Sequence, residues 1–490
     1  MLKNFSIYFI ILIYTFFLFN PVYCNLNLKS QTSAIQISSG STFYVENEIT
    51  NYNGKLIRED NSTLEGQNII FNNGILEDDG NKINISGTLT PDATNKIYLN
   101  GNTNLRMETG DILQTIEISN FNNYINGTIL CLNDITLQDI NTSVTSLILN
   151  ELPVNIQLND GMLFLNNNLS FKDDKKIIGP GKIFLNNWTL SFGFKDLTFE
   201  EPLIFDNSSN LKFHSNINLN ETWTFSGNNN VITTENNTIT LNNSGQITID
   251  AGSSLMIKNT TLNCINSNNL CCLDNAGKIT FQNVNILLSN DYTFSSGCFD
   301  VINDLKISGS FKFIYQSPIA STIKSNGTIS LSNNLTFSYN PNIANHNLIT
   351  FENETSSLIL NNATLHTTTT HLQLTKGNVV INENAYLSSD ETGQIMIGNN
   401  NSDDDFYCEF LNDARLNLTA GKLVYQNINS DAWKMNAINT VLNLYSYTTL
   451  NLQQNLNLQE GYANFYLNSS LETQTDKYLL GAVSNINEYQ

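Results

Sequence analysis

The sequence of 490 residues has little charge, since only 14% of its residues are Asp, Glu, Lys or Arg. Lys and Arg together number 23, only three of them Arg, against 44 Asp and Glu, so the formal net charge is −21. Proteins that bind nucleic acid need clustered cations to neutralise phosphates, so this balance excludes nucleic acid as a partner. The seven Pro are too few for a mucin-like stalk.

Long apolar runs are also missing after residue 24, so we expect no membrane span in the mature chain. Residues 1–24 differ, because Lys3 precedes an apolar run that extends to Phe19, as in a secretory signal peptide. We expect cleavage after Cys24, with Val22 and Cys24 at the −3 and −1 positions. Acylation of Cys24 and retention of the segment as an anchor are the alternatives. The protein is therefore expected to be secreted or associated with the cell surface or outer membrane.

Asn is abundant and makes up about one in six of all residues. From about residue 35 to 475 short apolar and polar alternations, such as Gly245–Asp250 and Thr328–Leu331, are interrupted by Asn, Gly, Ser and Asp. Alternation with a period of two predicts β-strands, and no convincing helical periodicity follows the signal peptide. The sequence predicts an all-β protein.

One local pattern recurs, in which a Gly precedes a short strand and an Asn follows it. The Gly marks a turn, and the Asn tolerates the left-handed bend before the next strand. We assign a structural role to these Asn residues. The copies are Gly127–Asn133, Gly181–Asn187, Gly277–Asn283, Gly327–Asn333 and Gly421–Asn427.

Repeated short strands separated by tight bends favour a solenoid. In a parallel stack each side chain lies ~4.8 Å from its counterpart in the next coil, so amides hydrogen-bond along the stack and like charges repel. High Asn and low charge then have one cause, and we predict a parallel, right-handed β-helix with ~20–25 residues per coil. The alternative is a string of β-sandwich modules, which would need linkers that the sequence does not show.

These features divide the chain into four predicted parts. Residues 1–24 are the signal peptide, and 25–60 are an N-terminal cap over the first open sheet edge. Residues 61–472 form the β-helix. The less regular residues 473–490 are a C-terminal cap or tail.

Two segments add a resemblance. Residues 249–341 begin IDAGSSLMIKNTTLNCINSNNLCCLDNAGKITFQN and end SNGTISLSNNLTFSYNP, and residues 415–433 read RLNLTAGKLVYQNINSDAW. Both resemble blocks of a family of large secreted parallel β-helix proteins, pectate-lyase-like or adhesin-like solenoids, from bacteria that live inside host cells. The resemblance implies a β-helix and export. It implies no chemistry, and no catalytic residue carries over.

Carbohydrate-active β-helix enzymes need converging carboxylates, with calcium or a basic residue in some classes. Adjacent Asp residues in a strand point to opposite faces, so such pairs work only in loops. The run Asp403, Asp404 and Asp405 lies in a polar loop and is a weak Ca²⁺ candidate, although the spacing of a dedicated calcium loop is missing. A solvated loop is the simpler interpretation. We identify no catalytic residue and no cofactor site.

Cysteine and histidine give weaker signals. Cys264, Cys271, Cys272 and Cys298 lie close together in the sequence, and in an exported protein a disulfide among them is one interpretation. Free thiols buried as small apolar groups are the other, with a metal site the least favoured. The four His residues have no zinc-ligand spacing.

The sequence therefore favours a secreted or surface-displayed, non-enzymatic solenoid with a structural or adhesive role, whose partner is a host surface or a glycan. The alternative is a carbohydrate-processing enzyme, a polysaccharide lyase or a glycosidase, on the same scaffold. An enzyme should gather acidic residues and a Lys or Arg on neighbouring coils of one face. A passive stack should scatter them to loops and caps.

Overall fold

The computed structural model describes short segments between residues 26 and 165 and a nearly continuous chain from 168 to 481. Within the latter part, the residues outside the description are 207, 243, 265–268, 342, 344–345, 391, 400–405, 412 and 436. Side chains are described chiefly from residue 155 onwards. The chain divides into two compact units, Met1–Lys212 and Phe213–Gln490.

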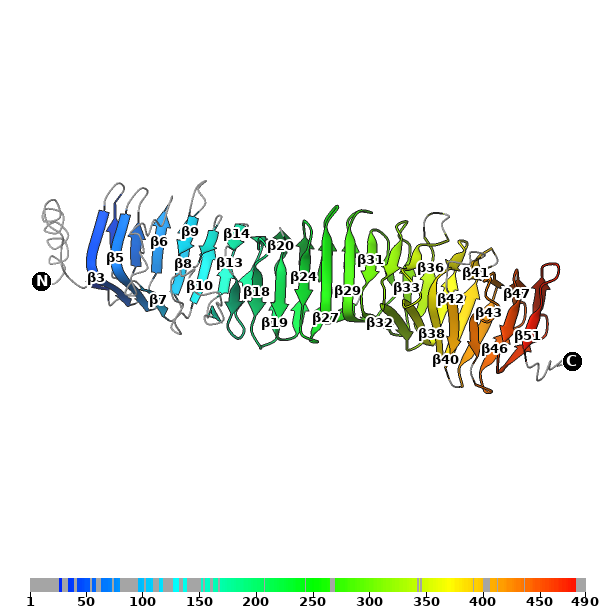
Figure 1. Ribbon diagram of the computed structural model, residues 1–490. Helices are drawn as coiled ribbons and strands as arrows, with labels where there is room; N and C mark the ends of the chain where they lie inside the picture. The colour runs from blue at the N-terminus through cyan, green and yellow to red at the C-terminus, as the bar shows by residue number, and fades with distance from the viewer. Residues whose placement is uncertain are drawn as a thin grey trace, which may run out of the picture. The chain divides into compact units, whose positions relative to one another are not determined.

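The strands of unit 1 pair in parallel with strands one coil away (Figure 1). One group of paired strands comprises β1 (Leu26–Leu28), β3 (Thr42–Tyr52), β5 (Thr63–Asn72) and β7 (Lys96–Asn100). A second comprises β2 (Ala34–Ile37), β4 (Lys55–Arg58), β6 (Ile75–Asp79), β8 (Thr103–Glu108), β10 (Gly127–Cys131), β13 (Asn155–Gln157) and β16 (Ile177–Ile178). A third comprises β9 (Gln114–Glu117), β11 (Ile135–Gln138), β14 (Met162–Leu165), β17 (Gly181–Phe184) and β20 (Leu203–Asp206). A fourth comprises β12 (Glu151–Leu152), β15 (Leu169–Phe171), β18 (Thr189–Phe192), β19 (Leu197–Phe199) and β21 (Asn210–Phe213), which ends at the first residue of unit 2.

Unit 2 repeats the arrangement. One group comprises β23 (Thr222–Phe225), β26 (Gln246–Ile249) and β28 (Leu270–Cys272). The largest comprises β22 (Ile217–Leu219), β24 (Asn230–Thr233), β25 (Thr238–Leu241), β27 (Ser254–Cys264), β29 (Lys278–Leu288), β30 (Tyr292–Phe294), β31 (Cys298–Val301), β32 (Asp304–Ser308), β33 (Lys312–Tyr315), β34 (Ser321–Ile323), β35 (Thr328–Ser332), β36 (Thr336–Tyr339), β37 (Ile349–Phe351), β38 (Ser357–Thr367), β40 (Gly377–Ser389), β42 (Phe406–Phe410), β43 (Arg415–Ala420), β45 (Trp433–Met435), β46 (Val441–Leu444) and β49 (Tyr462–Phe465). A further group comprises β39 (Leu372–Leu374), β41 (Gln394–Ile397), β44 (Lys422–Tyr425), β47 (Thr449–Leu452) and β50 (Ser470–Thr473), and β48 (Leu456–Leu458) pairs with β51 (Leu479–Gly481).

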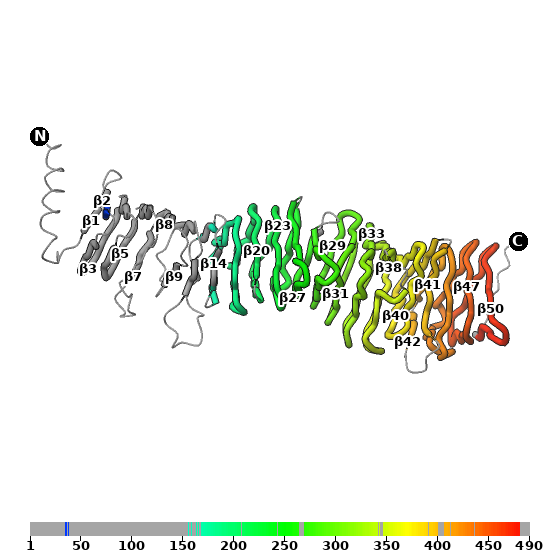
Figure 2. Tube along the Cα trace, turned by 90° about the horizontal axis from the view of Figure 1, so that it is seen from above, coloured from blue at the N-terminus to red at the C-terminus, as the bar shows by residue number. Residues whose placement is uncertain are grey.

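Successive coils stack in parallel register, so the fold is a parallel β-solenoid of about 13 turns. Figure 2 shows the coils of unit 2 following one another along the chain, in green through red. The coils differ in length. Ile279 lies opposite Phe299, whereas Ala385 lies opposite Leu416, and the second pair is separated by about half as many residues again as the first. The described residues contain no helix, and the predicted all-β solenoid is confirmed. A string of β-sandwiches is excluded because every strand pair found is parallel.

Like side chains stack on one another inside the coils. Most short strands alternate buried and partly exposed residues, which leaves one apolar row facing inward. In unit 2 the rings of Phe313 and Phe337 stack at 5.5 Å between centroids, and those of Tyr315 and Tyr339 at 6.1 Å. This core explains why an alternating sequence with 40% apolar residues suffices for the fold.

Non-glycine residues in the left-handed conformation, most of them Asn, turn the chain at the corners of the coils. Among the described residues, 11 of the 18 non-glycine residues with positive φ are Asn. In β27 and β29, Asn259 (φ 47°) and Asn283 (φ 56°) separate the two halves of each strand, which pair with different neighbours. Nδ2 of Asn283 donates to Oδ1 of Asn259 at 3.0 Å. At this corner an Asn in the left-handed conformation also hydrogen-bonds to its counterpart one coil away.

The predicted cap at 25–60 contributes strands β1 to β4, and β2 and β4 pair in parallel as later strands do. In the predicted tail at 473–490, β51 pairs in parallel with β48, and residues 482–490 lie outside the described residues. The signal peptide, residues 1–24, also lies outside them. Within the described part of the chain no helix has the length and apolar content to cross a bilayer.

Candidate functional site

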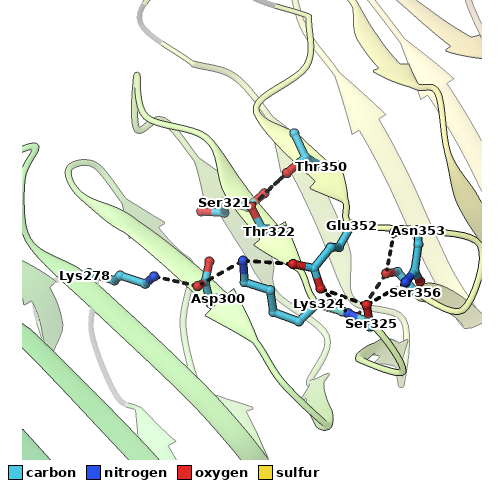
Figure 3. Close-up of polar contacts among 10 residues, drawn as sticks. All are labelled: Lys278, Asp300, Ser321, Thr322, Lys324, Ser325, Thr350, Glu352, Asn353 and Ser356. Atoms are coloured by element: carbon cyan, nitrogen blue, oxygen red, sulfur yellow. Dashed lines mark hydrogen bonds and ion pairs between the residues drawn. The ribbon is translucent and has the colours of Figure 1, made fainter. Parts of the chain in front are cut away.

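Charged side chains gather on four neighbouring coils of unit 2 (Figure 3). Lys278 opens β29, Asp300 lies in β31, Lys324 directly follows β34, and Glu352 directly follows β37. We call these four residues the charged ladder. The parallel register brings them together, because Asp300 lies opposite Thr322 and the next strand places Thr322 opposite Thr350.

Asp300 is the buried centre of the charged ladder, with 8% of the residue exposed. Its Oδ2 lies 2.6 Å from Nζ of Lys278 on the preceding coil and 3.7 Å from Nζ of Lys324 on the following coil. A buried carboxylate is tolerated only when paired and hydrogen-bonded. The two lysines supply that compensation from either side, as Figure 3 shows.

Glu352 ends the charged ladder and is held by the turn one coil earlier. The backbone N–H and the hydroxyl of Ser325 donate to its Oε2 at 2.8 and 2.9 Å, and Nζ of Lys324 lies 3.5 Å from Oε1. The Ser325 N–H and hydroxyl, together with Lys324, lower the pKa of the Glu352 carboxyl. Nδ2 of Asn353 donates in turn to the Ser325 hydroxyl at 2.6 Å. Glu352 is therefore an ionised carboxylate whose partners are already in place.

These partners limit the chemistry that the charged ladder can perform. A glycosidase general acid needs a carboxyl group with a raised pKa, and that of Glu352 is lowered. The neighbouring Cys298 is half-buried, and burial raises the pKa of its thiol, so it is not an activated nucleophile. What the geometry does provide is a chain of alternating charges that links four coils.

A second arrangement lies on the outward face of β40, β43, β46 and β49. Asn417, Asn443 and Asn464 occupy equivalent positions on three successive coils. Nδ2 of Asn443 donates to Oδ1 of Asn417 at 2.8 Å, and Nδ2 of Asn464 donates to Oδ1 of Asn443 at 2.9 Å. Nδ2 of Asn417 donates to the carbonyl of Ala385 at 3.1 Å, so the amides form one directional chain. We call these three residues the asparagine ladder.

Tyrosines flank the asparagine ladder on the same outward face. Tyr445 follows β46 and Tyr466 follows β49, and their rings stack with centroids 4.8 Å apart and planes 1° from parallel. They are 38% and 37% exposed, whereas Asn417 and Asn443 are only 4% and 6% exposed. Burial, with Tyr466 and Tyr386, raises the pKa of Tyr445, and Arg415 opposes that shift. We call Tyr386, Arg415, Tyr445 and Tyr466 the tyrosine face.

The predicted structural Asn residues have more than one role. Asn187, Asn283 and Asn333 have φ values of 70°, 56° and 60°, the left-handed bend that the pattern predicts. Asn427 instead is buried, and its Nδ2 donates to the Phe406 carbonyl at 3.0 Å. Asn133 lies outside the described residues. Each Gly of the pattern opens or directly precedes a strand, namely β10, β17, β29, β35 and β44.

The predicted calcium and disulfide residues have different outcomes. Asp403, Asp404 and Asp405 lie outside the described residues, as does the side chain of Cys264. Cys271, Cys272 and Cys298 carry free thiols, so the structure shows none of the disulfides considered for these three. Burial raises the pKa of Cys272 to about 12, which is typical of an inert buried thiol. In the described part of the chain no cluster of three or more His, Cys, Asp or Glu residues is placed to hold a metal.

The structure also pairs two histidines that show no relation in the sequence. His346 and His371 stack with ring centroids 4.7 Å apart. Burial and the neighbouring His346 lower the pKa of His371, whose Nδ1 is buried without a hydrogen-bond partner among the described residues. The two lie 25 residues apart, one coil length, so only a known register would have revealed the pair.

Comparison with protein-family models, with curated proteins and with solved structures finds no match, so chemistry on the coil surfaces is the guide to function.

Proposed function

We propose that this protein is an exported β-solenoid with a structural or adhesive role and no catalytic activity. The charged ladder is the observation that carries the proposal. It brings two carboxylates and two lysines to neighbouring coils, as an enzyme site would, but these groups bind one another. A catalytic site needs acid, base or electrostatic groups left available to the substrate.

Export is part of the proposal, and two features of the sequence support it. Residues 1–24 have the charge and apolar pattern of a signal peptide. Residues 249–341 and 415–433 resemble secreted β-helix proteins of bacteria that live inside host cells. We therefore propose a location outside the cell or on its surface, with a glycan or another host-surface component as the partner.

A binding experiment tests this function. The chain from residue 25 to 490 is purified, labelled and applied to intact host cells and to cells treated with glycosidases or proteases. An adhesive protein should be retained on intact cells, and one treatment should abolish retention by removing its ligand. A chain that binds neither cells nor isolated surface components contradicts the adhesive role, and N-terminal sequencing of the exported chain tests cleavage after Cys24.

A carbohydrate-processing enzyme is the second candidate. Its support is that Asp300 and Glu352 lie on one face, two coils apart, with Lys324 between them (Figure 3). A lyase acting on a polyuronate releases an unsaturated product that absorbs ultraviolet light. Turnover of a polyuronate by the wild-type chain that Asp300→Asn abolishes, with folding intact, would overturn the non-enzymatic proposal.

A further inference from the structure

Arg415 is an unusual cation for this chain. It is one of three Arg in a protein with a net charge of −21, and it lies exposed at the start of β43. Lys278 and Lys324 form ion pairs, but Arg415 has no ion pair or hydrogen bond through its side chain among the described residues. Because the Arg415 guanidinium is exposed and has no partner among the described residues, it is available to an external anion.

The groups around Arg415 point to the kind of anion. Strand alternation places Arg415 on the outward face with Asn417, because Leu416 and Leu418 point into the core. Tyr445 and Tyr466 lie on the next two coils of this face, with stacked and partly exposed rings. The tyrosine face therefore combines a guanidinium, aromatic surface and phenol hydroxyls on coils that rise by ~4.8 Å each.

The asparagine ladder adds an acceptor. Its hydrogen bonds all run in one direction, from each Nδ2 to the preceding coil, so Oδ1 of Asn464 is left at the open end. Asn464 is partly exposed, and this oxygen has no hydrogen-bond partner among the described residues. Chains of amides polarise one another, which strengthens the terminal acceptor.

We propose that the tyrosine face binds an acidic saccharide, a glycan that ends in or contains a uronic or sialic acid. The guanidinium of Arg415 donates two parallel hydrogen bonds to the sugar carboxylate. The Tyr445 and Tyr466 side chains pack against the ring and hydrogen-bond its hydroxyls, and Oδ1 of Asn464 accepts from a hydroxyl. An acidic peptide would pair with Arg415 but would leave the amide of Asn464 and the phenol groups on the next two coils largely unused. This inference rests on the proposed adhesive function and names its ligand class.

Titration calorimetry with defined saccharides tests the proposal. The chain from 25 to 490 is titrated with sialyllactose and oligogalacturonate, with lactose as the neutral counterpart, and with a short poly-aspartate peptide. At least one acidic saccharide should bind, about tenfold or more tighter than lactose or the peptide, since hydrogen bonds to a charged partner contribute most. Equal binding of lactose, or tighter binding of the peptide, would overturn the proposal, as would the absence of binding by both acidic saccharides.

Matched variants locate the site. Arg415→Gln should weaken acidic-saccharide binding about tenfold or more, and Tyr466→Ala should weaken it while leaving the guanidinium in place. Lys434→Gln removes the same charge from a lysine that lies over the Tyr407 ring, 3.8 Å from its centroid, and should leave affinity unchanged. Unaltered binding by Arg415→Gln overturns the assignment of the site.

The same variants separate this inference from the proposed function. If wild-type chain and Arg415→Gln are retained equally on host cells, the tyrosine face is not the site, but the adhesive function stands. If neither is retained on any cell or isolated surface component, the adhesive function fails as well.

Discussion

The charged ladder and the tyrosine face lie on the same solenoid and use their coils differently. In the charged ladder Asp300 binds lysines on both neighbouring coils, and Glu352 accepts hydrogen bonds from the turn one coil earlier. Beside the tyrosine face, the amides of Asn417 and Asn443 are hydrogen-bonded within the asparagine ladder, while Arg415 and the rings of Tyr445 and Tyr466 remain exposed. Side chains that form ion pairs or hydrogen bonds with neighbouring coils join those coils. Exposed side chains without such partners remain available to a ligand.

The difference follows from the solenoid geometry. Equivalent positions recur every ~4.8 Å, so a charge in one coil is stable when the next coil supplies its opposite. Where a coil supplies a neutral amide instead, hydrogen bonds link the coils and charge is unnecessary. Side chains that are paired within the solenoid are thereby distinguished from side chains left exposed for binding.

The largest effect is expected in the asparagine ladder. Asn443→Ala leaves Oδ1 of Asn417 and Nδ2 of Asn464 without their partners, and should lower the free energy of unfolding by about 2–4 kcal/mol. Denaturant unfolding followed by circular dichroism measures it. Asn457→Ala is the matched control, because its exposed amide bonds only Asp431, and it should cost less than about 0.5 kcal/mol. Equal costs for the two variants would contradict a structural role for the buried ladder.

The charged ladder should give the next largest effect. Asp300→Ala leaves Lys278 and Lys324 facing each other without their shared carboxylate, and should cost about 1–3 kcal/mol in the same assay. The control is Asp174→Ala, which removes an exposed ion pair with Lys175 and should cost less than about 0.5 kcal/mol. If Asp300→Ala leaves the free energy of unfolding unchanged, the charged ladder does not join coils, and a catalytic role for it must be considered again.

A smaller effect is expected from acid. Burial lowers the pKa of His366, and burial together with His346 lowers the pKa of His371. The unfolded chain then binds protons more readily than the folded one, so stability should fall as the pH drops below 6.5, the ordinary histidine value. Thermal midpoints measured across this range should show the loss, and His371→Gln should reduce it. An unchanged pH dependence in His371→Gln would exclude the histidine stack as a cause.

The smallest effect on stability is expected on the tyrosine face. Arg415 is exposed and makes no ion pair among the described residues, so Arg415→Ala should change the free energy of unfolding by less than about 0.5 kcal/mol. The same denaturant assay checks this beside Asp300→Ala. A cost as large as that of Asp300→Ala would place Arg415 among the structural residues and remove the contrast between the two regions.

Much of the fold was predictable because its causes are local. Alternation of apolar and polar residues gives strands, and Asn at the end of a strand, as at Asn283, gives a left-handed bend from its own conformational preference. Low charge follows from stacking of equivalent positions, which is also a property of the pattern. The sequence by itself therefore determined an all-β parallel solenoid with asparagine corners.

Which side chains meet was decided by the tertiary structure alone. The coil that begins at Ala385 is about half as long again as the one that begins at Ile279, so a partner one coil away cannot be found by counting. The charged ladder, the His346–His371 stack and the tyrosine face each depend on that register. The sequence gives the chemistry of each side chain. Which side chain lies opposite it in the next coil depends on the length of the coil, and only the folded structure fixes that length.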